Sequence, residues 1–336
     1  MERQITGRFP GIGCAWADAA GTEKEEYYGA ADREKHIPVN EDTIFPACSI
    51  SKFITAICVM KLQEQRIINT DMPVNHYLRQ WKLLATDGSD SEATIRSILC
   101  HTAGIVDGED GFHGLRRGDP EVRLTDILEG RTTYNNHPAR AEKPQGTAFE
   151  YSDAGYCVLQ QMMQETLHED FESIAQEIVF DPLKLQGTFF ASPGNTARFE
   201  NRMATGYDDK GQPIPGRFPS VPDLAASGLW STPKELLAIG KEFISALNGS
   251  SVFMLKKTAQ EMAKPVDRFP WTGLGLFIGG EDMLVSQGWS ENGQCMMKMN
   301  RRSKEISVVM TNRDPGADQK ESGVEWLTDR NLNAEK

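Results

Sequence analysis

An unusually apolar run, Phe53 to Met60, constrains the fold of this chain more than any other stretch. It directly follows residues 49–52 (Ser-Ile-Ser-Lys), and we predict a helix over about 51–65 that is hydrophobic all round. Such a helix has to be buried, so other elements must cover it on every side. The same helix carries polar chemistry, because Ser49 and Lys52 are three residues apart and share one face.

Two interpretations of residues 49–52 follow from the spacing. Burial of the Lys52 amine would lower its pKa and let it act as a base toward the Ser49 hydroxyl, which is the chemical logic of the S-x-x-K serine acyl enzymes. Alternatively, the segment is an ordinary capped helix start in which Ser49 or Ser51 is the cap. The spacing alone leaves both interpretations open.

Strand patterns lie at both ends of the chain. Apolar and aromatic residues predict two antiparallel strands near the N-terminus, and alternation predicts four more strands near the C-terminus, at 11–17, 26–32, 273–279, 282–287, 294–299 and 305–311. A closing helix would begin between Glu321 and Leu327.

Helical patterns fill the middle. Residues 154–168 and 170–180 have helical apolar spacing, and a further helix over about 233–247 would be capped by Thr232, with Pro233 in its first turn. Glycine and proline content predicts loops at 104–118 and an irregular connection at 205–225.

These patterns predict two structural parts. Residues 1–80 and 205–336 would form one discontinuous sheet domain, and residues 81–204 would form a helical domain inserted into it. A cleft between domains is the usual place for a small-ligand site, so we expect the active site there.

Length and charge narrow the class of protein. The 336 residues suit one large or two ordinary domains. The net charge is −12, and Arg116-Arg117 and Arg301-Arg302, interpreted as solvated turn residues, are the basic pairs. Nucleic acid is therefore not an expected partner. The acidic field should repel anionic substrates unless the pocket itself is basic.

Cysteines, histidines and apolar segments exclude further classes. The six cysteines lie far apart without a C-x-x-C pair and the six histidines have no ligand spacing, so neither a metal site nor another cofactor is expected. Cys48 is interpreted as a packed small residue, with a reactive thiol as the alternative. No stretch approaches the roughly 18 apolar residues of a membrane span. The first six residues do not resemble a leader, so we expect a cytoplasmic protein or one whose export signal was removed.

Three further motifs accompany residues 49–52. They are His101-Thr102-Ala103-Gly104, then Tyr151-Ser152-Asp153, then Ser286-Gln287-Gly288-Trp289 ahead of a strand-like segment at 306–312. In order and separation they resemble the class C β-lactamase and penicillin-binding-protein family of serine hydrolases, from about Gly11 to the C-terminal region. The resemblance implies an α/β fold with an inserted all-α domain, in which helices from both chain ends flank an antiparallel sheet.

The resemblance also implies roles for individual residues. Ser49 would be the nucleophile, at a helix N-terminus that favours a developing oxyanion. The oxyanion hole would pair the N–H groups of Ser49 and Trp289. Lys52 would be the base or the charge that tunes it, and Tyr151 a second base and proton shuttle that needs a neighbouring cation to ionise. The motif at His101 would be structural.

Two positions depart from the β-lactamase pattern. Asp153 replaces the usual Asn, cannot donate a hydrogen bond when ionised, and should hold Lys52 charged and raise its pKa. Ser286 replaces the usual Lys or His and supplies no cation. With Gln287 and Gly288, these residues complete the predicted substrate-binding or oxyanion set. Asn292 and Gly293 also depart from the pattern, and a strand bulge is expected there.

We therefore predict a serine hydrolase that forms an acyl-enzyme on an ester, amide or short-peptide carbonyl, with weak or no β-lactamase activity. Two alternatives remain open: a non-catalytic or acylation-only protein of the penicillin-binding or sensor type, and an acyltransferase. The expected partner is a small-molecule substrate. The sequence does not indicate an oligomeric state.

Overall fold

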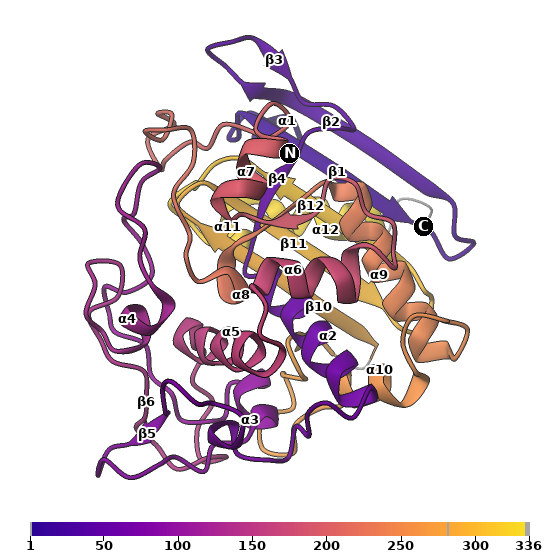
Figure 1. The fold of residues 1–336 in the computed structure, drawn as a ribbon. Helices are drawn as coiled ribbons and strands as arrows, with labels where there is room; N and C mark the ends of the chain where they lie inside the picture. The colour runs from indigo at the N-terminus through magenta and orange to yellow at the C-terminus, as the bar shows by residue number, and fades with distance from the viewer. Residues whose placement is uncertain (1, 281, 333–336) are drawn as a thin grey trace.

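Strands from the two ends of the chain lie side by side in one sheet. The structure is a computed structural model that describes residues 2–280 and 282–332. Its seven-stranded sheet is antiparallel throughout, in the order β3-β2-β1-β12-β11-β10-β9. The strand β1 (Gly11–Ala17) pairs with β2 (Glu23–Asp32) on one side and with β12 (Ile306–Thr311) on the other (Figure 1). The predicted joining of the chain ends is confirmed.

The C-terminal strands differ from prediction in two places. β10 (Met283–Ser290) and β11 (Gly293–Asn300) form a hairpin whose register runs without a shift as far as the pair Ser290↔Gly293. The expected bulge at Asn292 is therefore wrong, because that residue belongs to the two-residue turn. The strand predicted over 273–279 shrinks to β9 (Phe277–Ile278). Gly275, at φ +75°, interrupts the strand, because its N–H donates to the carbonyl of Leu99 and not to a neighbouring strand.

Helices cover both faces of the sheet. The helices α9 (Pro233–Asn248), α10 (Lys256–Met262) and α2 (Ser51–Glu64) lie over one face, and α1 (Glu2–Thr6), α11 (Gln319–Ser322) and α12 (Val324–Leu332) over the other (Figure 1). Alternate strand residues serve the two cores: Cys14, Met296 and Val309 pack with α12, whereas Ala15, Met297 and Val308 join the core that contains α9 and α2. The predicted cap of α9 is confirmed, because Thr232 accepts from the N–H of Glu235.

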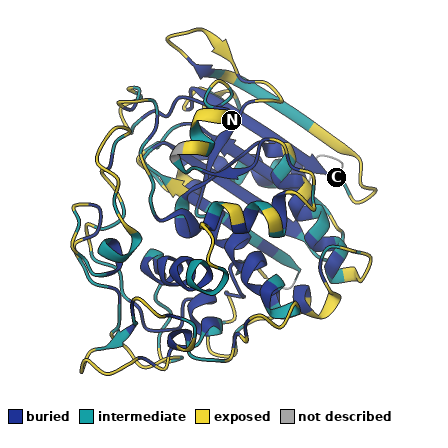
Figure 2. Ribbon diagram, viewed as in Figure 1, coloured by how far each residue is buried: buried dark blue, intermediate teal, exposed yellow. Residues whose placement is uncertain are grey.

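The apolar helix α2 is buried, as its composition predicts. Every residue from Ser51 to Met60 is buried (Figure 2). The capped-helix interpretation is wrong, since Ile50 occupies the N-cap and no side chain caps the helix. Ser51 instead donates to the Cys48 carbonyl and accepts from the N–H of Leu229, which ties the helix start to strand β8 (Leu229–Ser231).

The middle of the chain supplies short elements that pack around α2. The helix predicted over 170–180 is a short α-helix continued by a π-helical turn, and the other elements are mostly brief. They are β3 (Ile37–Pro38), β4 (Phe45–Cys48), η1 (Val74–His76), β5 (Leu84–Ala85), α3 (Ile95–Leu99), α4 (Leu124–Leu128), β6 (Arg140–Ala141), α5 (Asp153–Leu167), α6 (Phe171–Ala175), η2 (Gln176–Phe180), β7 (Phe189–Phe190), α7 (Pro193–Phe199), α8 (Leu224–Ser227) and β8 (Leu229–Ser231).

One core joins the sheet part to the helical part. Residues of α5, α6 and α2 belong to the same buried cluster as those of β10–β12. We retain the division into residues 1–80 with 205–336 and residues 81–204 as a proposal. No helix within the described residues is both long and apolar enough to cross a membrane.

Candidate active site

The predicted Ser–Lys pair is formed at the start of α2. Lys52 is 3% exposed, and its Nζ donates to Ser49 Oγ at 3.1 Å. The same Nζ donates to the Ala226 carbonyl of α8 at 3.0 Å and lies 2.5 Å from Asp153 Oδ1 at the start of α5. Three segments that are distant in sequence therefore hold one ammonium group.

Lys52 remains charged in this setting. Burial lowers the pKa of Lys52, but the opposing effects of Asp153 and Tyr151 are together larger, and the pKa is raised above its usual value. The net shift of the pKa is therefore opposite to the one expected from burial, and the role of Lys52, as base or as the charge that tunes it, stays a prediction. The expectation that Asp153 would hold it charged is confirmed.

Tyr151 lies over the ammonium group. Lys52 Nζ is 4.8 Å from the centre of the Tyr151 ring, and that ring stacks on His101 at 4.4 Å. The residue is 39% exposed, while its hydroxyl group interacts with Lys52 and Ser49. Burial of the hydroxyl raises the Tyr151 pKa, Lys52 lowers it and Asp153 raises it, and the balance is a raised pKa.

His101 is a neutral supporting group in this arrangement. It is 6% exposed, and its Nδ1 accepts from the N–H of Ser152 at 3.1 Å. Burial and the nearby Lys52 lower the His101 pKa to about 3. A ring that accepts at Nδ1 and stays unprotonated holds the segment of Tyr151 in place, in line with the structural role that the resemblance implies.

Two carboxyl groups behind Asp153, the half-buried Asp107 and the fully buried Asp223, were not predicted from the sequence. Asp107 accepts from Ser152 Oγ at 2.7 Å and from the N–H groups of Asp153 and Ala154 at 2.6 and 3.1 Å. Burial and the charge of Asp153 raise its pKa to about 6. Its position three residues after the motif that begins at His101 is the one local hint of its role.

The second carboxyl group, Asp223, comes from the irregular connection before α8. It is fully buried, and its Oδ1 accepts from the Tyr134 hydroxyl at 2.5 Å. Its Oδ2 has no hydrogen-bond partner among the residues that the structure describes. Burial first, and Asp153 second, raise the Asp223 pKa to about 7. No sequence pattern marks Asp223 or Tyr134, since the two are 89 residues apart.

The predicted substrate strand is β10. Ser286 and Gly288 face α2, and Gly288 packs so closely that a Cβ there would lie 2.6 Å from the backbone N of Ser49. Because successive side chains of a strand point to opposite faces, Gln287 and Trp289 start from the face opposite to that of Ser286 and Gly288. The Gln287 side chain therefore points away from Ser49. The Trp289 indole N–H donates to Asp314 at 2.8 Å.

A cavity of about 140 Å³ opens beside Ser49. Asp153 lies on its wall, and the remaining lining combines four aromatic rings, from Phe112, Tyr134, Trp230 and Trp289, with small, polar and proline residues. At its rim, Glu291 accepts from the N–H of Gly114 at 2.6 Å and pairs with Arg116 at 2.5 Å.

The two pairs of neighbouring arginines differ in their positions and contacts. Arg117 is an exposed turn residue, as interpreted from the sequence, and it also pairs with Glu200, whereas Arg116 is half-buried and pairs with Glu291. Arg301 and Arg302 do lie in a turn, between β11 and β12.

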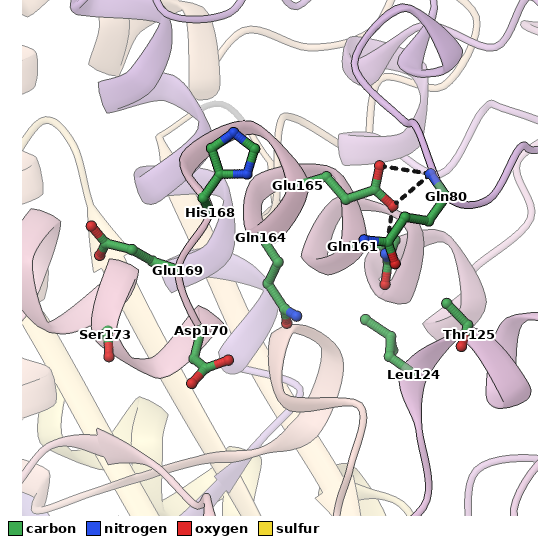
Figure 3. A pocket seen from close by; sticks show the side chains of 10 residues that line it. All are labelled: Gln80, Leu124, Thr125, Gln161, Gln164, Glu165, His168, Glu169, Asp170 and Ser173. Carbon is green, nitrogen blue, oxygen red and sulfur yellow. Dashed lines mark hydrogen bonds between the residues drawn. The ribbon is translucent and has the colours of Figure 1, made fainter.

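A larger cavity, of about 770 Å³, lies away from Ser49 among α4, α5 and α6. Its lining is mostly polar, and the carboxylate of Glu165 accepts from the Gln161 side chain and from the N–H of Gln80 (Figure 3). That carboxylate is engaged in holding the segment of Gln80 to α5. Among the described residues, no group of three His, Cys, Asp or Glu is arranged to hold a metal ion. Cys48 is 1% exposed and packed against Ser290.

Comparison with known proteins identifies relatives over most of the chain. The family model described as Beta-lactamase matches residues 1–328. The unguisins hydrolase ungD of Aspergillus violaceofuscus is 28% identical over 207 residues, which are 60% of this chain and 35% of that protein. Esterase EstB of Burkholderia gladioli is 28% identical over 194 residues, 56% of this chain and 48% of the esterase. The chain thus spans about a third to a half of the length of these curated relatives.

A solved structure shows the same fold. The octameric penicillin-binding protein homologue from Pyrococcus abyssi superposes with a TM-score of 0.77 at 22% identity, covering 97% of this chain and 74% of its own. The predicted fold, an antiparallel sheet flanked by helices from both chain ends with helices inserted between, is confirmed.

Proposed function

Because the chain belongs to the Beta-lactamase family, we propose that it is a serine hydrolase that forms an acyl-enzyme on an ester, amide or short-peptide carbonyl. The observation that carries this proposal is the 3.1 Å contact between Ser49 Oγ and Lys52 Nζ at the start of a buried helix. The names of two relatives, a hydrolase and an esterase, support it.

Ser49 would attack the substrate carbonyl, with its own N–H and that of Trp289 stabilising the oxyanion. The close approach of Gly288 to the backbone N of Ser49 supports this pairing. β9 pairs only with Leu284 and Val285 in the described part of β10, so the strand beyond them is an edge that leaves backbone groups free for a substrate.

The ion pair between Lys52 and Asp153 leaves Tyr151 as the base. Its phenolate form would be a minor species that Lys52 stabilises, and it would take the Ser49 proton as the acyl-enzyme forms. The same phenol would then return a proton to the leaving group. Water would complete the cycle by attacking the acyl-enzyme.

Covalent labelling tests this proposal. A fluorophosphonate probe should label Ser49 in the wild type, as identified by peptide mass spectrometry, and Ser49→Ala should abolish both labelling and turnover of a p-nitrophenyl ester. Ser51→Ala is the matched control and should retain labelling, because its hydroxyl serves the helix start. Unchanged ester turnover in Ser49→Ala would refute the proposal.

We further propose weak or no β-lactamase activity. Asp153 cannot donate to the side-chain amide of a penicillin, and Ser286 offers no cation for its carboxylate. Arg313 is engaged by the carbonyls of Arg8, Asp208 and Asp209, and Arg301 donates to the carbonyl of Ala263. Two lost charge-assisted bonds, at roughly 1.5–3 kcal/mol each, lower kcat/KM for nitrocefin by a hundredfold or more.

The measurement compares nitrocefin with a p-nitrophenyl ester, in the wild type and in the double variant Asp153→Asn with Ser286→Lys. In the double variant, the ratio of kcat/KM for nitrocefin to kcat/KM for the ester should be higher than in the wild type. Wild-type hydrolysis of nitrocefin at about 10⁵ M⁻¹s⁻¹ or above, well within the ordinary enzyme range, would contradict the substrate argument.

A further inference from the structure

The cavity beside Ser49 has the size of one small substituent. An apolar cavity of roughly 150 Å³ takes a benzene molecule, so the 140 Å³ here suits a group of a few heavy atoms. Four aromatic rings, from four separate segments of the chain, form part of its wall. Tyr134 and Trp230 are buried, whereas Trp289 is 45% exposed and lies at the opening. The faces of aromatic rings carry negative potential and attract cations.

The charge around the cavity is negative. The Asp153 side chain is 23% exposed and lines the cavity with Ser49. Behind it lie Asp107 and the fully buried Asp223, whose Oδ2 has no hydrogen-bond partner in the described chain. The charge of Asp153 raises the pKa of both carboxyl groups. Lys52 is the single cation held among these three carboxyl groups, and His101 is neutral.

An anion or a purely apolar group fits this lining poorly. No lysine or arginine is among the residues that line the cavity, and the Arg116 charge at its rim is held by Glu291. A substrate carboxylate would meet Asp153 without a compensating cation. An apolar group would cover the Asp153 carboxylate and remove its water without replacing the lost hydrogen bonds.

We propose that this cavity binds an ammonium group on the acyl side of the substrate, so that the preferred esters or amides are those of short amino acids. This inference rests on the proposed function for its reaction and on the cavity lining for its selectivity. The ammonium group would donate to the Asp153 oxygen not directed at Lys52 and would lie against the rings of Phe112 and Trp289. The acyl carbonyl would then face Ser49.

Three isosteric esters test the proposal. They are the p-nitrophenyl esters of 3-aminopropanoate and butanoate and the monoester of succinate, which carry an ammonium, a methyl and a carboxylate at the same position. At a pH of about 7.5 we expect kcat/KM for the ammonium ester to exceed that for butanoate at least tenfold. The succinate ester should fall at least tenfold below butanoate. Equal or higher kcat/KM for butanoate than for the ammonium ester in the wild type would overturn the inference.

Variants test whether residues of the cavity cause the preference for the ammonium ester. Phe112→Leu keeps an apolar wall but removes the ring, and it should lower the ammonium-to-butanoate ratio several-fold. Asp153→Asn should bring that ratio close to one. Phe269→Leu changes an aromatic residue outside the cavity and should leave the ratio as in the wild type. A ratio unaffected by both Phe112→Leu and Asp153→Asn would overturn the proposal.

A binding measurement separates this inference from the proposed function. In Ser49→Ala protein, propylammonium chloride should shift the indole N–H resonances of Trp230 and Trp289 in a saturable way. Sodium propionate should not, and Phe112→Leu should weaken the propylammonium effect. Absence of ester turnover with saturable propylammonium binding would refute the hydrolase alone. Turnover that depends on Ser49, without any preference for the ammonium ester, would refute the ammonium site alone.

Discussion

Asp153 changes the chemistry of its surroundings more than any other residue in the site. Its carboxylate lies 2.5 Å from Lys52 Nζ, and its charge raises the pKa of Lys52, Tyr151, Asp107 and Asp223. An asparagine here would remove this contribution and lower the pKa of Lys52. The aspartate instead keeps Lys52 in the ammonium form, and this is the reason that Tyr151 is the proposed proton acceptor.

The pH dependence of turnover should therefore reflect Tyr151. Because its pKa is raised, we expect kcat/KM for a p-nitrophenyl ester to rise with pH on the alkaline side of neutrality. Asp153→Asn removes a contribution that raises this pKa, so the rise should move to lower pH. Tyr151→Phe should lower turnover about a hundredfold or more. A pH profile in Asp153→Asn that is unmoved or displaced upward would contradict the assignment.

Asp223 should make the protein less stable as the pH rises. Its folded-state pKa of about 7 lies above the ordinary 3.8, so the folded chain holds this proton more tightly than the unfolded chain. The stability present at low pH is then lost between about pH 4 and pH 7, at up to about 1.4 kcal/mol per pKa unit.

Asp223→Asn tests this linkage by urea unfolding. Relative to the wild type, the variant should be more stable at pH 8 than at pH 5, so the free energy of unfolding of the variant minus that of the wild type should be larger at pH 8. The matched control is the exposed Asp90→Asn, whose difference from the wild type should not change between the two pH values. The same result for Asp223→Asn as for the control would show that this carboxyl group is not strained by burial.

At the scale of elements, the site exists where the start of α2 meets β10 and α8. The short helix α8 contributes two carbonyls, since Ala226 accepts from Lys52 and Ala225 from Thr55. β10 contributes a flat surface, because Gly288 has no side chain between the strand and Ser49. None of these three elements makes a site alone.

Gly288→Ala should separate β10 from α2. The new Cβ would lie 2.6 Å from both the Ser49 backbone N and Cys48 Cβ, so the strand has to move away from Ser49, the proposed nucleophile. We expect ester turnover to fall about a hundredfold or more, since oxyanion stabilisation depends on exact placement of the donors. Gly194→Ala, where a Cβ meets nothing within 4 Å, is the control and should keep wild-type turnover. Near wild-type kcat/KM in Gly288→Ala would exclude this strand from the oxyanion hole.

At the scale of the whole molecule, Asn312 links three distant parts of the chain. Its Oδ1 accepts from the N–H of Gly11 at 2.7 Å, and its Nδ2 donates to the carbonyls of Ala30 and Thr205 at 3.2 and 3.0 Å. It is fully buried. The side chain thus connects the N-terminal strands to the C-terminal end of the sheet and to the connection that leads to α8.

Asn312→Ala should destabilise the fold substantially. It leaves a buried N–H and buried carbonyls without partners, at roughly 1–3 kcal/mol each, so a loss of about 3 kcal/mol or more is expected in urea unfolding. Asn248→Ala is the control, because that side chain donates only to the preceding turn of its own helix and should cost less than about 1 kcal/mol. Equal losses in the two variants would contradict the linking role of Asn312.

The sequence by itself determined the elements with strong local patterns and the residues with fixed spacing. β1 falls on the predicted residues 11–17, α9 starts at its predicted cap, and the run after Lys52 is a buried helix. The contact between Ser49 and Lys52 follows from the turn that leads into α2, in which the N–H of Lys52 donates to the Ser49 carbonyl. Such features depend on neighbours within one or two turns, and the sequence displays those neighbours directly.

Only the tertiary structure decided the electrostatics and the shape of the site. Burial alone predicts a neutral Lys52. The family resemblance already predicted that Asp153 would keep it charged, but the 2.5 Å contact that does so comes from the packing of α5 against α2. Asp107, Asp223 and the rings around the cavity meet across long stretches of chain that no periodicity connects. A pKa and a cavity depend on which distant groups come together in a low-dielectric interior, and that is a property of the packed chain rather than of any segment.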